Sequence, residues 1–448
     1  MASASEQLAA SMNFGAFSKA TELKKRLWFT LGALIVYRLG TYIPIPGIDQ
    51  AAFQSFFDLQ RSGFLGMFNM FAGGAVERMT ILALNIMPYI SAAIIMQLLT
   101  AVSPHLEQLK KEGEQGRKKI NQYTRYGTVG LAALQAFGIA VGLEGTSSAQ
   151  GQVVANPGLY FEASTVITLT GGTIFLMWLG EQITARGVGN GISLIIFSGI
   201  VAGLPNATAQ TLELGRQGSI STAFILLLFI MVIGVVVFVV FMERAQRRIV
   251  VQYPKRQQGN RMTGGESSHM PLKLNASGVI PLIFASSLLL MPVTVAGFSG
   301  GQGGPGWLAD ITAFIGRGQP LYLTVYLGLI VFFCFFYTAI VFNPAETADN
   351  LRKYGGFIPG IRPGKQTADY LDYVLTRITV VGAAYLGAVA LLPEILVTRF
   401  SVPFFFGGTS LLIVVSVTMD TTAQIQSHLL AHQYEGLIKK SRLRGRRG

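Results

Sequence analysis

The chain has 448 residues, and its composition excludes an ordinary soluble domain. Only 13% of the residues are charged and 51% are hydrophobic, with a mean hydropathy of +0.48 and a formal net charge of +13. A soluble domain carries roughly 25% charged residues, about twice as many. The apolar residues form long runs, and a run of about 20 spans the hydrocarbon core of a bilayer. The composition therefore predicts an integral membrane protein.

Ten such runs follow one another along the chain. In hydrocarbon each span must satisfy its own backbone hydrogen bonds, which predicts helices, and the alternating segments of a membrane β-barrel are absent. The expected fold class is an all-α polytopic membrane protein with ten transmembrane helices. The predicted spans are Leu27–Ile43, Met79–Val102, Gly127–Leu143, Ala163–Leu179, Val188–Leu204, Ile220–Phe241, Gly278–Val295, Tyr322–Phe342, Ile378–Leu396 and Pro403–Met419.

Lysine and arginine favour cytoplasmic loops, and their distribution orients the ten spans. With the N-terminus inside and the sides alternating, only six of the 35 basic residues fall outside. Both termini are therefore expected in the cytoplasm, as the segment 1–26 and the basic tail 420–448. This basic face is expected to attract anionic lipids. Two cytoplasmic loops, 243–274 and 343–377, are long enough to meet a large partner.

The spans divide into two sets of five, 27–204 and 220–419, and an odd number per set means that the second set runs inverted. In transporters built this way the pathway lies between the repeats. Irregularities recur at corresponding places: the fifth and tenth spans are short and begin in glycine-rich stretches, and prolines (Pro88, Pro281 and Pro292) interrupt the second and seventh. These four helices are predicted to line the pathway.

An apolar, glycine-punctuated segment lies between the first and second spans. It is too short to span a bilayer and too apolar for an ordinary exposed loop. A short helix closing the outer mouth of a cavity and a helix lying at the membrane interface both fit. Little beyond local packing is expected to hold it, so its displacement should be easy. The segment consists of Gly63, Phe64, Leu65, Gly66, Met67, Phe68, Asn69, Met70, Phe71, Ala72, Gly73 and Gly74.

Patterns typical of an enzyme are missing. The four histidines have no metal-ligand spacing. The stretch 360–365 has three residues between its glycines, where a phosphate-binding loop has four, and Gln366 follows its lysine where Ser or Thr is needed. No catalytic residue, metal site or cofactor is expected. Acidic residues are nearly absent from the span interiors, which argues against an ion-coupled pump.

Six motifs follow one another in chain order. They are NIMPYIS at 85–91, KEGE at 111–114 with YTRYG at 123–127, GNGIS at 189–193, GVIP at 278–281 with FASS at 284–287, NPAE at 343–346 through PGIRPG at 359–364, and GGTSLLI at 407–413. On these motifs the sequence resembles, over essentially its whole length, the SecY family of channel-forming subunits of the bacterial Sec protein translocase.

The resemblance implies two inverted five-helix halves around a central pore, with an apolar constriction and a short plug helix on its outer side. The plug falls on residues 63–74, and a lateral gate between the second and seventh spans falls near Ser91 and Met291. The constriction falls on six residues of the four singled-out spans, in part at i, i+4 spacing, which faces one direction. They are Ile86, Ile90, Ile192, Ile196, Ile283 and Ile413.

The implied function is the passage of unfolded polypeptides across a bacterial plasma (inner) membrane, with sideways release of hydrophobic segments into the bilayer. The implied partners are SecE-like and SecG-like small membrane subunits, a SecA-type motor ATPase and the ribosome. Arg362 matches the family's critical loop arginine. Docking of a cytosolic partner is expected on Arg247, Arg248, Lys255, Arg256 and Arg362.

Two other classes stay open. A secondary transporter for a small solute, built on inverted repeats, predicts a polar midplane pocket and coupling ions, whereas this chain offers isoleucines and large basic loops. A passive membrane scaffold fits the composition, but it leaves the plug segment and the paired irregularities without a role.

Overall fold

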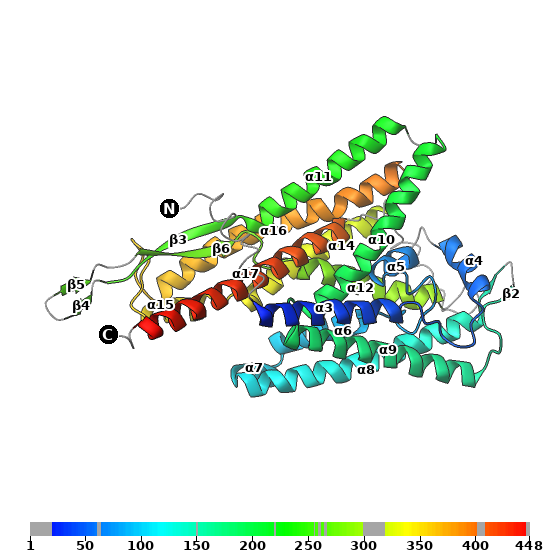
Figure 1. Ribbon diagram of the computed structural model, residues 1–448, viewed down its shortest axis with the longest axis horizontal. Coiled ribbons are helices and arrows are strands. Elements are labelled where there is room, and N and C mark those ends of the chain that lie inside the picture. The colour runs from blue at the N-terminus through cyan, green and yellow to red at the C-terminus, as the bar shows by residue number, and fades with distance from the viewer. Residues whose placement is uncertain are drawn as a thin grey trace.

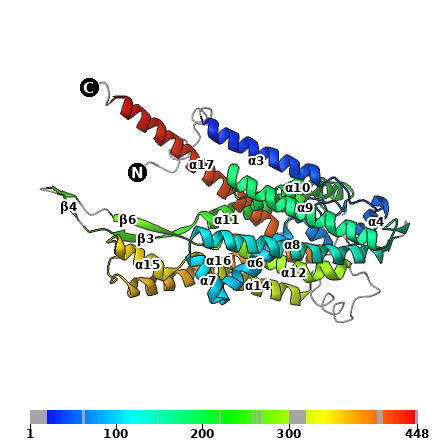
Figure 2. The ribbon, with the colours of Figure 1, turned by 90° about the horizontal axis from the view of Figure 1, so that it is seen from below.

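The computed structural model describes residues 20–60, 64–148, 151–218, 221–254, 256–258, 261–263, 267–298, 319–400 and 408–444. Within these ranges the protein is mostly helical, and its long helices run roughly along the long axis of the molecule (Figure 1). A view turned by 90° shows the same elongated bundle, with a pair of strands extending beyond one end (Figure 2).

Each of the ten predicted spans falls on a helix. By length and apolar composition alone, six helices in the described ranges could cross a membrane, and a seventh could if α6 and α7 (Pro104–Lys111), bent by 98°, form one span. The helices on the predicted spans are α3 (Thr21–Gly40), α6 (Met87–Val102), α8 (Glu114–Glu144), α9 (Leu159–Arg186), α10 (Gly191–Arg216), α11 (Thr222–Arg244), α12 (Ile280–Phe298), α14 (Pro320–Val341), α16 (Lys365–Phe400) and α17 (Gly408–Arg444).

The second span begins later than predicted. Residues 72–86 form turns, and α6 starts at Met87. Met79 and Asn85 have φ angles of +41° and +50°, a left-handed conformation that a right-handed helix cannot contain. Pro88 lies in the first turn of α6, where its missing N–H has no partner to lose. The prediction that Pro88 and Pro281 interrupt the second and seventh spans is wrong, because each lies in the first turn of its helix, Pro88 in α6 and Pro281 in α12.

The fifth and tenth spans are not short. Helix α10 has 26 residues and α17 has 37, because polar residues continue each helix beyond its apolar run. Asn190 starts α10, and its side-chain oxygen accepts hydrogen bonds from the N–H groups of Ile192 (3.1 Å) and Ser193 (3.4 Å). Such a cap satisfies donors that have no partner inside the helix.

The loops contain short elements, and of these the sequence predicted only the short helix within residues 63–74. Residues 243–274 include an antiparallel hairpin instead of an irregular loop, so the fold is mostly helical and not strictly all-α. The remaining elements are α4 (Gln50–Gln60), α5 (Phe64–Phe71), α15 (Pro344–Lys353), β1 (Ser147–Ser148), β2 (Gly151–Gln152), β3 (Gln246–Gln252), β4 (Arg256–Gln258), β5 (Arg261–Thr263) and β6 (Ser267–Lys273). Strands pair as β1 with β2, β3 with β6, and β4 with β5.

One large apolar core joins the long helices, and many apolar side chains also lie on the outside. Helix α11 is the extreme case, since Leu226, Ile230 and Phe241 are each at least 60% exposed. An apolar surface of this extent is unfavourable in water but suits contact with lipid tails. The outer faces of the bundle therefore agree with a membrane environment.

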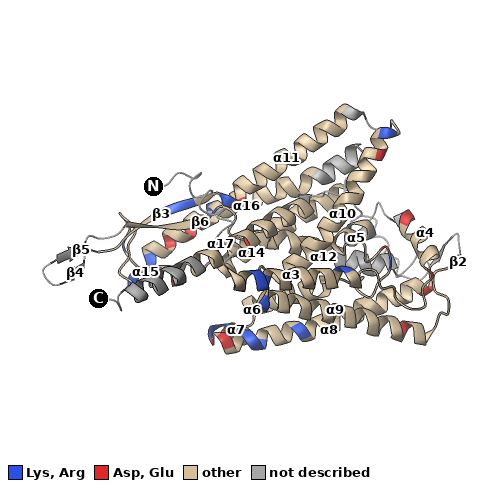
Figure 3. Ribbon diagram, in the orientation of Figure 1, with Lys and Arg blue, Asp and Glu red and all other residues tan. Residues whose placement is uncertain are grey.

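Charge gathers at one end of the molecule. Lysine and arginine cluster around β3, α15 and α7, whereas the middle of the bundle is mostly tan, the colour of uncharged residues (Figure 3). The hairpin of β3 and β6 extends from the same end, toward which α17 also runs (Figure 1). The distribution agrees with the preference of basic residues for the cytoplasmic side.

Candidate functional site

Five of the six predicted isoleucines line one small cavity, which we call the isoleucine cavity. Four helices that are far apart in the sequence, α6, α10, α12 and α17, meet around it together with the end of α5. These are the four helices that the paired irregularities singled out. The cavity is very small, with a volume of about 10 Å³. Its lining consists of Phe71, Asn85, Ile86, Met87, Ile90, Ile196, Ile283, Ser286 and Ile413.

The lining is almost entirely apolar. Ile86 and Ile413 are fully buried, and Ile90 and Ile196 are 5% and 4% exposed. None of the described lining residues carries a charge. An apolar lining of this kind offers no groups that could replace the hydration shell of an ion.

The sixth isoleucine, Ile192, does not line the cavity. It is the second residue of α10, one turn before Ile196, where this helix begins against α9. A Cβ atom on Gly180 of α9 would lie 3.2 Å from Cγ1 of Ile192, so the Ile192 side chain packs on α9. A Cβ atom on Gly191 would collide with the Gly180 carbonyl oxygen, and the two glycines therefore allow the close crossing.

Helices α6 and α12 lie against each other along a seam, where the lateral gate was predicted. The Ser287 hydroxyl of α12 donates a hydrogen bond of 3.6 Å to the sulfur of Met87. Ser91 is buried on α6, and Met291 lies in α12. A hydroxyl–thioether bond is weak, because sulfur is a poor acceptor. The described contacts across the seam are therefore apolar or only weakly polar.

The plug segment, residues 63–74, contains helix α5 and the turn that follows it. Its first residue, Gly63, lies outside the described residues. Helix α5 packs against α10 and α12, and Phe68 and Phe71 are each only 4% exposed. Since Phe71 also lines the isoleucine cavity, the plug segment closes one side of it.

Three side chains from outside the plug segment hold the end of α5. The pairs are Asn85 Nδ2 with the carbonyl oxygen of Phe71 (2.7 Å), Tyr37 Oη with that of Ala72 (3.3 Å), and Arg38 Nη1 with that of Gly73 (2.8 Å). The last carbonyl groups of a helix lack partners within it, and these bonds supply them. The expectation that little beyond local packing holds the segment is wrong at this end.

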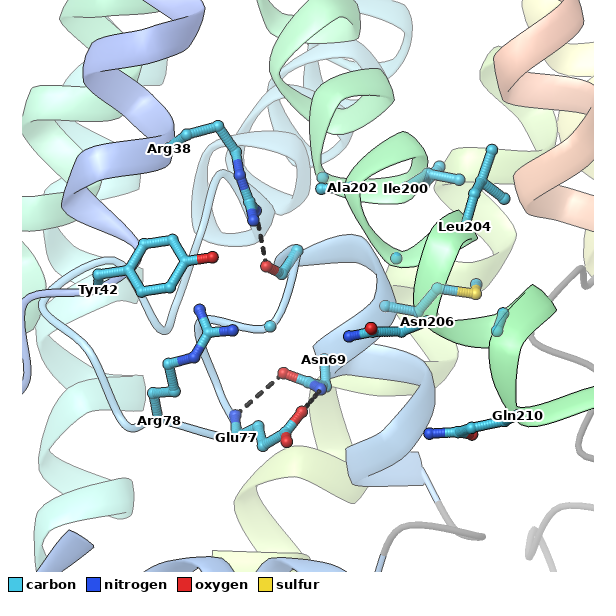
Figure 4. A pocket seen from close by; sticks show the side chains of 16 residues that line it. Arg38, Tyr42, Asn69, Glu77, Arg78, Ile200, Ala202, Leu204, Asn206 and Gln210 are labelled. Carbon is cyan, nitrogen blue, oxygen red and sulfur yellow. Dashed lines mark hydrogen bonds between the residues drawn. The ribbon is translucent and has the colours of Figure 1, made fainter. Parts of the chain in front are cut away.

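A second pocket lies beside the plug segment, between α3 and α10, and both polar and apolar side chains line it (Figure 4). Asn69 and Glu77 bond reciprocally at its edge: Asn69 Nδ2 donates to Glu77 Oε2 (3.1 Å), and the Glu77 N–H donates to Asn69 Oδ1 (2.9 Å). The Arg78 guanidinium lies 4.1 Å from the centre of the Tyr42 ring. The plug segment thus presents Phe71 to the isoleucine cavity and polar groups to this outer pocket.

The predicted docking residues lie on the hairpin and on the neighbouring loop. Arg247 and Arg248 are exposed on β3, Arg256 lies on β4, and Lys255 lies outside the described residues. The two loops are physically joined, because strand β3 exchanges two backbone hydrogen bonds of 2.9 Å with Phe357. A small apolar core under them contains Ile249, Leu272, Ile358, Leu371, Val374, Leu375 and Ile378. The loops form one basic surface, which we call the docking surface after its predicted role.

Arg362 is exposed in the turn that precedes α16. It lies between Gly360 and Gly364, whose φ angles of +82° and +108° are left-handed and favour glycine. Its carbonyl oxygen accepts a 2.9 Å hydrogen bond from the hydroxyl of Thr367, which is buried. The backbone is therefore held in place while the guanidinium stays free to contact a carboxylate or phosphate.

Sequence reasoning missed the residues that hold the plug segment. Tyr37 and Arg38 belong to the first span, and nothing in their spacing points to a partner 35 residues away. Asn85 carried a visible signal, because it is the one polar residue in the apolar stretch 81–86. An amide in such surroundings needs a hydrogen-bond partner, which could have been sought among neighbouring backbone groups.

Known proteins of similar sequence identify the family. The family model described as SecY matches residues 80–422 of this chain. The protein translocase subunit SecY of Escherichia coli strain K12 is 58% identical over 424 residues, which cover 95% of this chain and 96% of that protein. The protein translocase subunit SecY of Vibrio cholerae serotype O1 is 56% identical over 431 residues, or 96% of each chain.

Solved structures of lower sequence identity share the fold. One described as a protein conducting channel superposes with a TM-score of 0.63 at 20% identity, covering 91% of this chain and 92% of that chain. Sec61 in a canine ribosome-channel complex from the endoplasmic reticulum superposes with a TM-score of 0.61 at 20% identity and the same coverage. These matches confirm the predicted mostly helical membrane fold. The chain belongs to the SecY family.

Proposed function

We propose that this protein is the channel-forming subunit of a bacterial protein translocase and that unfolded polypeptides cross the plasma membrane through the isoleucine cavity. The observation that carries the proposal is the meeting of five isoleucines from four helices at one closed point. An apolar ring selects no particular sequence, which suits a passage for chains of any composition. A carrier of a small solute would need several polar binding groups, and the described lining offers only Asn85 and Ser286 as polar side chains.

The seam between α6 and α12 is the proposed lateral gate, near Ser91 and Met291. Contacts across it are apolar or weakly polar, so separating the two helices breaks few hydrogen bonds. A sufficiently hydrophobic segment in the passage then gains free energy by moving into lipid. The plug segment is the proposed removable seal on the outer side.

Energy for transport has to come from a partner, since the sequence offers no nucleotide-binding motif. A SecA-type motor ATPase or a ribosome would dock on the docking surface and contact Arg362. The exposure and charge of this surface support docking, and so does the ribosome in the complex with canine Sec61. SecE-like and SecG-like small subunits would complete the channel, anionic lipids would contact the basic face, and both termini would lie in the cytoplasm.

Crosslinking of a chain in transit tests the proposal. A photoreactive side chain is placed at Ile413 in the cavity and, as a matched control, at Ile230, which is 60% exposed on α11. A polypeptide arrested midway through export into membrane vesicles should crosslink at position 413 and not at position 230. Equal yields at the two positions, or crosslinks at 230 alone, would place the passage elsewhere.

A further inference from the structure

We propose that Asn85 is a positioning residue that ties the plug segment to the isoleucine cavity and thereby sets how readily the closed channel opens. The inference rests on the proposed function, since it assigns a residue that controls the same channel. Asn85 is neither one of the six isoleucines nor part of the plug segment. It is the last residue but one before α6 begins.

Asn85 connects the two parts of the closure directly. Its side chain is one of those that line the cavity, next to Ile86. The Nδ2 group donates a 2.7 Å hydrogen bond to the carbonyl oxygen of Phe71, the last residue of α5. Of the three side chains that hold the end of α5, Asn85 makes the shortest bond and is the one that also lines the cavity. Moving the plug segment away therefore breaks this bond.

The backbone turn alone does not explain an asparagine here. Asn85 has a left-handed φ of +50°, and two apolar residues and Pro88 follow it. Helix α12 begins in the same way, with Gly278 at φ +63°, two apolar residues and Pro281. Glycine suffices for the turn at that position. Of the two turns, the one at Asn85 carries a side-chain amide. This is also the turn whose side chain reaches the end of α5.

The other end of the same amide favours opening. Asn85 is only 2% exposed, and its Oδ1 atom accepts no hydrogen bond from any described residue. A buried acceptor without a partner is unfavourable, and water satisfies it when the cavity becomes hydrated. The donor of Asn85 thus stabilises the closed state while its acceptor stabilises the wet, open state. The amide leaves the channel closed but easily opened.

Two substitutions separate this role from its alternatives. Asn85→Gly keeps the left-handed backbone and removes the donor. Aspartate at this position has the same shape and also adopts the left-handed backbone, but its ionised carboxylate only accepts hydrogen bonds and cannot donate to the Phe71 carbonyl oxygen. The full channel with its partner subunits is reconstituted in vesicles, and the ion conductance of the idle channel and the export of a client with a defective signal sequence are measured. Loss of the donor should raise both by about two- to tenfold in Asn85→Asp. The rise should be smaller in Asn85→Gly, which also removes the acceptor that favours opening.

Each alternative predicts a different result. If Asn85 only formed the turn, Asn85→Gly would be silent, and if it only filled space, Asn85→Gly would leak while Asn85→Asp would not. Either result would overturn the proposal. The matched control is Gly278→Asn, which adds an amide at the corresponding turn, where a Cβ atom meets nothing within 4 Å. We expect no change for it, and a leak equal to that of Asn85→Gly would also count against a specific tie.

Crosslinking in the same vesicles distinguishes this proposal from the proposed function. If an arrested polypeptide still crosslinks at Ile413 while both Asn85 variants conduct like the unaltered protein, the passage stands and the role of Asn85 is wrong. If crosslinking at Ile413 fails in the unaltered protein, both proposals fall together.

Discussion

The isoleucine cavity and the basic docking surface are built in opposite ways. The cavity is buried and uncharged in its described lining, and it forms from four helices spread over most of the chain. The docking surface is exposed and basic, forms from two loops, and rests on a small apolar core of its own. A passage for arbitrary chains needs an unselective lining, whereas recognition of one partner needs directed charge. The molecule keeps the two kinds of chemistry apart.

This separation makes the two regions independently testable. A change at the docking surface should affect how transport is driven and leave the closed channel tight. A change at the cavity or the plug segment should make the idle channel leak and leave docking intact. A variant with both defects would contradict the comparison, because distant sites without shared contacts usually act independently.

The largest effect is expected for Arg362→Glu. Reversing the charge of residue 362 replaces an attraction to an acidic group on the partner with a repulsion, so motor-driven export should fall at least tenfold. Export into vesicles with the motor and ATP measures this, and the idle conductance should not change. The matched control is Lys353→Glu, an exposed basic residue of the same loop. Equal losses in both variants would mean that the partner senses net charge and not Arg362.

Deletion of residues 64–71 should have the next largest effect. It removes Phe68 and Phe71, the latter from the lining of the cavity, and should raise the ion conductance of the idle channel severalfold. Export should continue, since the docking surface is untouched. Single-channel recording and an export assay on the same vesicles check both statements. An unchanged conductance would show that the plug segment is not a seal.

Ile413→Asn should have the smallest effect of the three. The fully buried Ile413 would lose packing of about 1–3 kcal/mol, and the new amide would retain water in the cavity. Closed and open states often differ by only a few kcal/mol, so leakage and export of signal-defective clients should both rise measurably. The control is Ile230→Asn on the outer face of α11, with the amount of membrane-inserted protein measured for both. If the two variants behave alike, Ile413 does not belong to a constriction.

The sequence predicted the helices well because the bilayer sets their length and their apolar composition. It also singled out the four helices around the cavity, since glycine and proline recur at corresponding positions in the two sets of spans. The reason for the prolines was wrong in part, because Pro88 starts α6 and does not kink it. The start of α6 depends on local backbone conformation. The left-handed φ angles of the residues before it cannot be read from the composition.

Other features depend on tertiary contacts that spacing does not encode. Ile192 shares its helix and its i, i+4 spacing with Ile196, yet the crossing of α10 over α9 turns it toward Gly180. The hairpin of β3 and β6 was missed because its residues are polar on both faces over much of their length, without a clear two-residue alternation. The tie between Asn85 and Phe71 joins residues that no periodic pattern relates.

The size of the isoleucine cavity limits what can occupy it. One turn of an α-helix, about 10 Å wide and 5.4 Å long, fills roughly 400 Å³, which far exceeds the cavity volume of about 10 Å³. A polypeptide can therefore pass only after the surrounding helices move apart. Ile86 and Ile90 belong to the start of α6 and Ile283 to α12, the same two helices that form the seam. Movement of α12 away from α6 would widen the cavity and open the seam at the same time. The same movement would therefore let a polypeptide cross the membrane and let a segment of it leave sideways into the lipid.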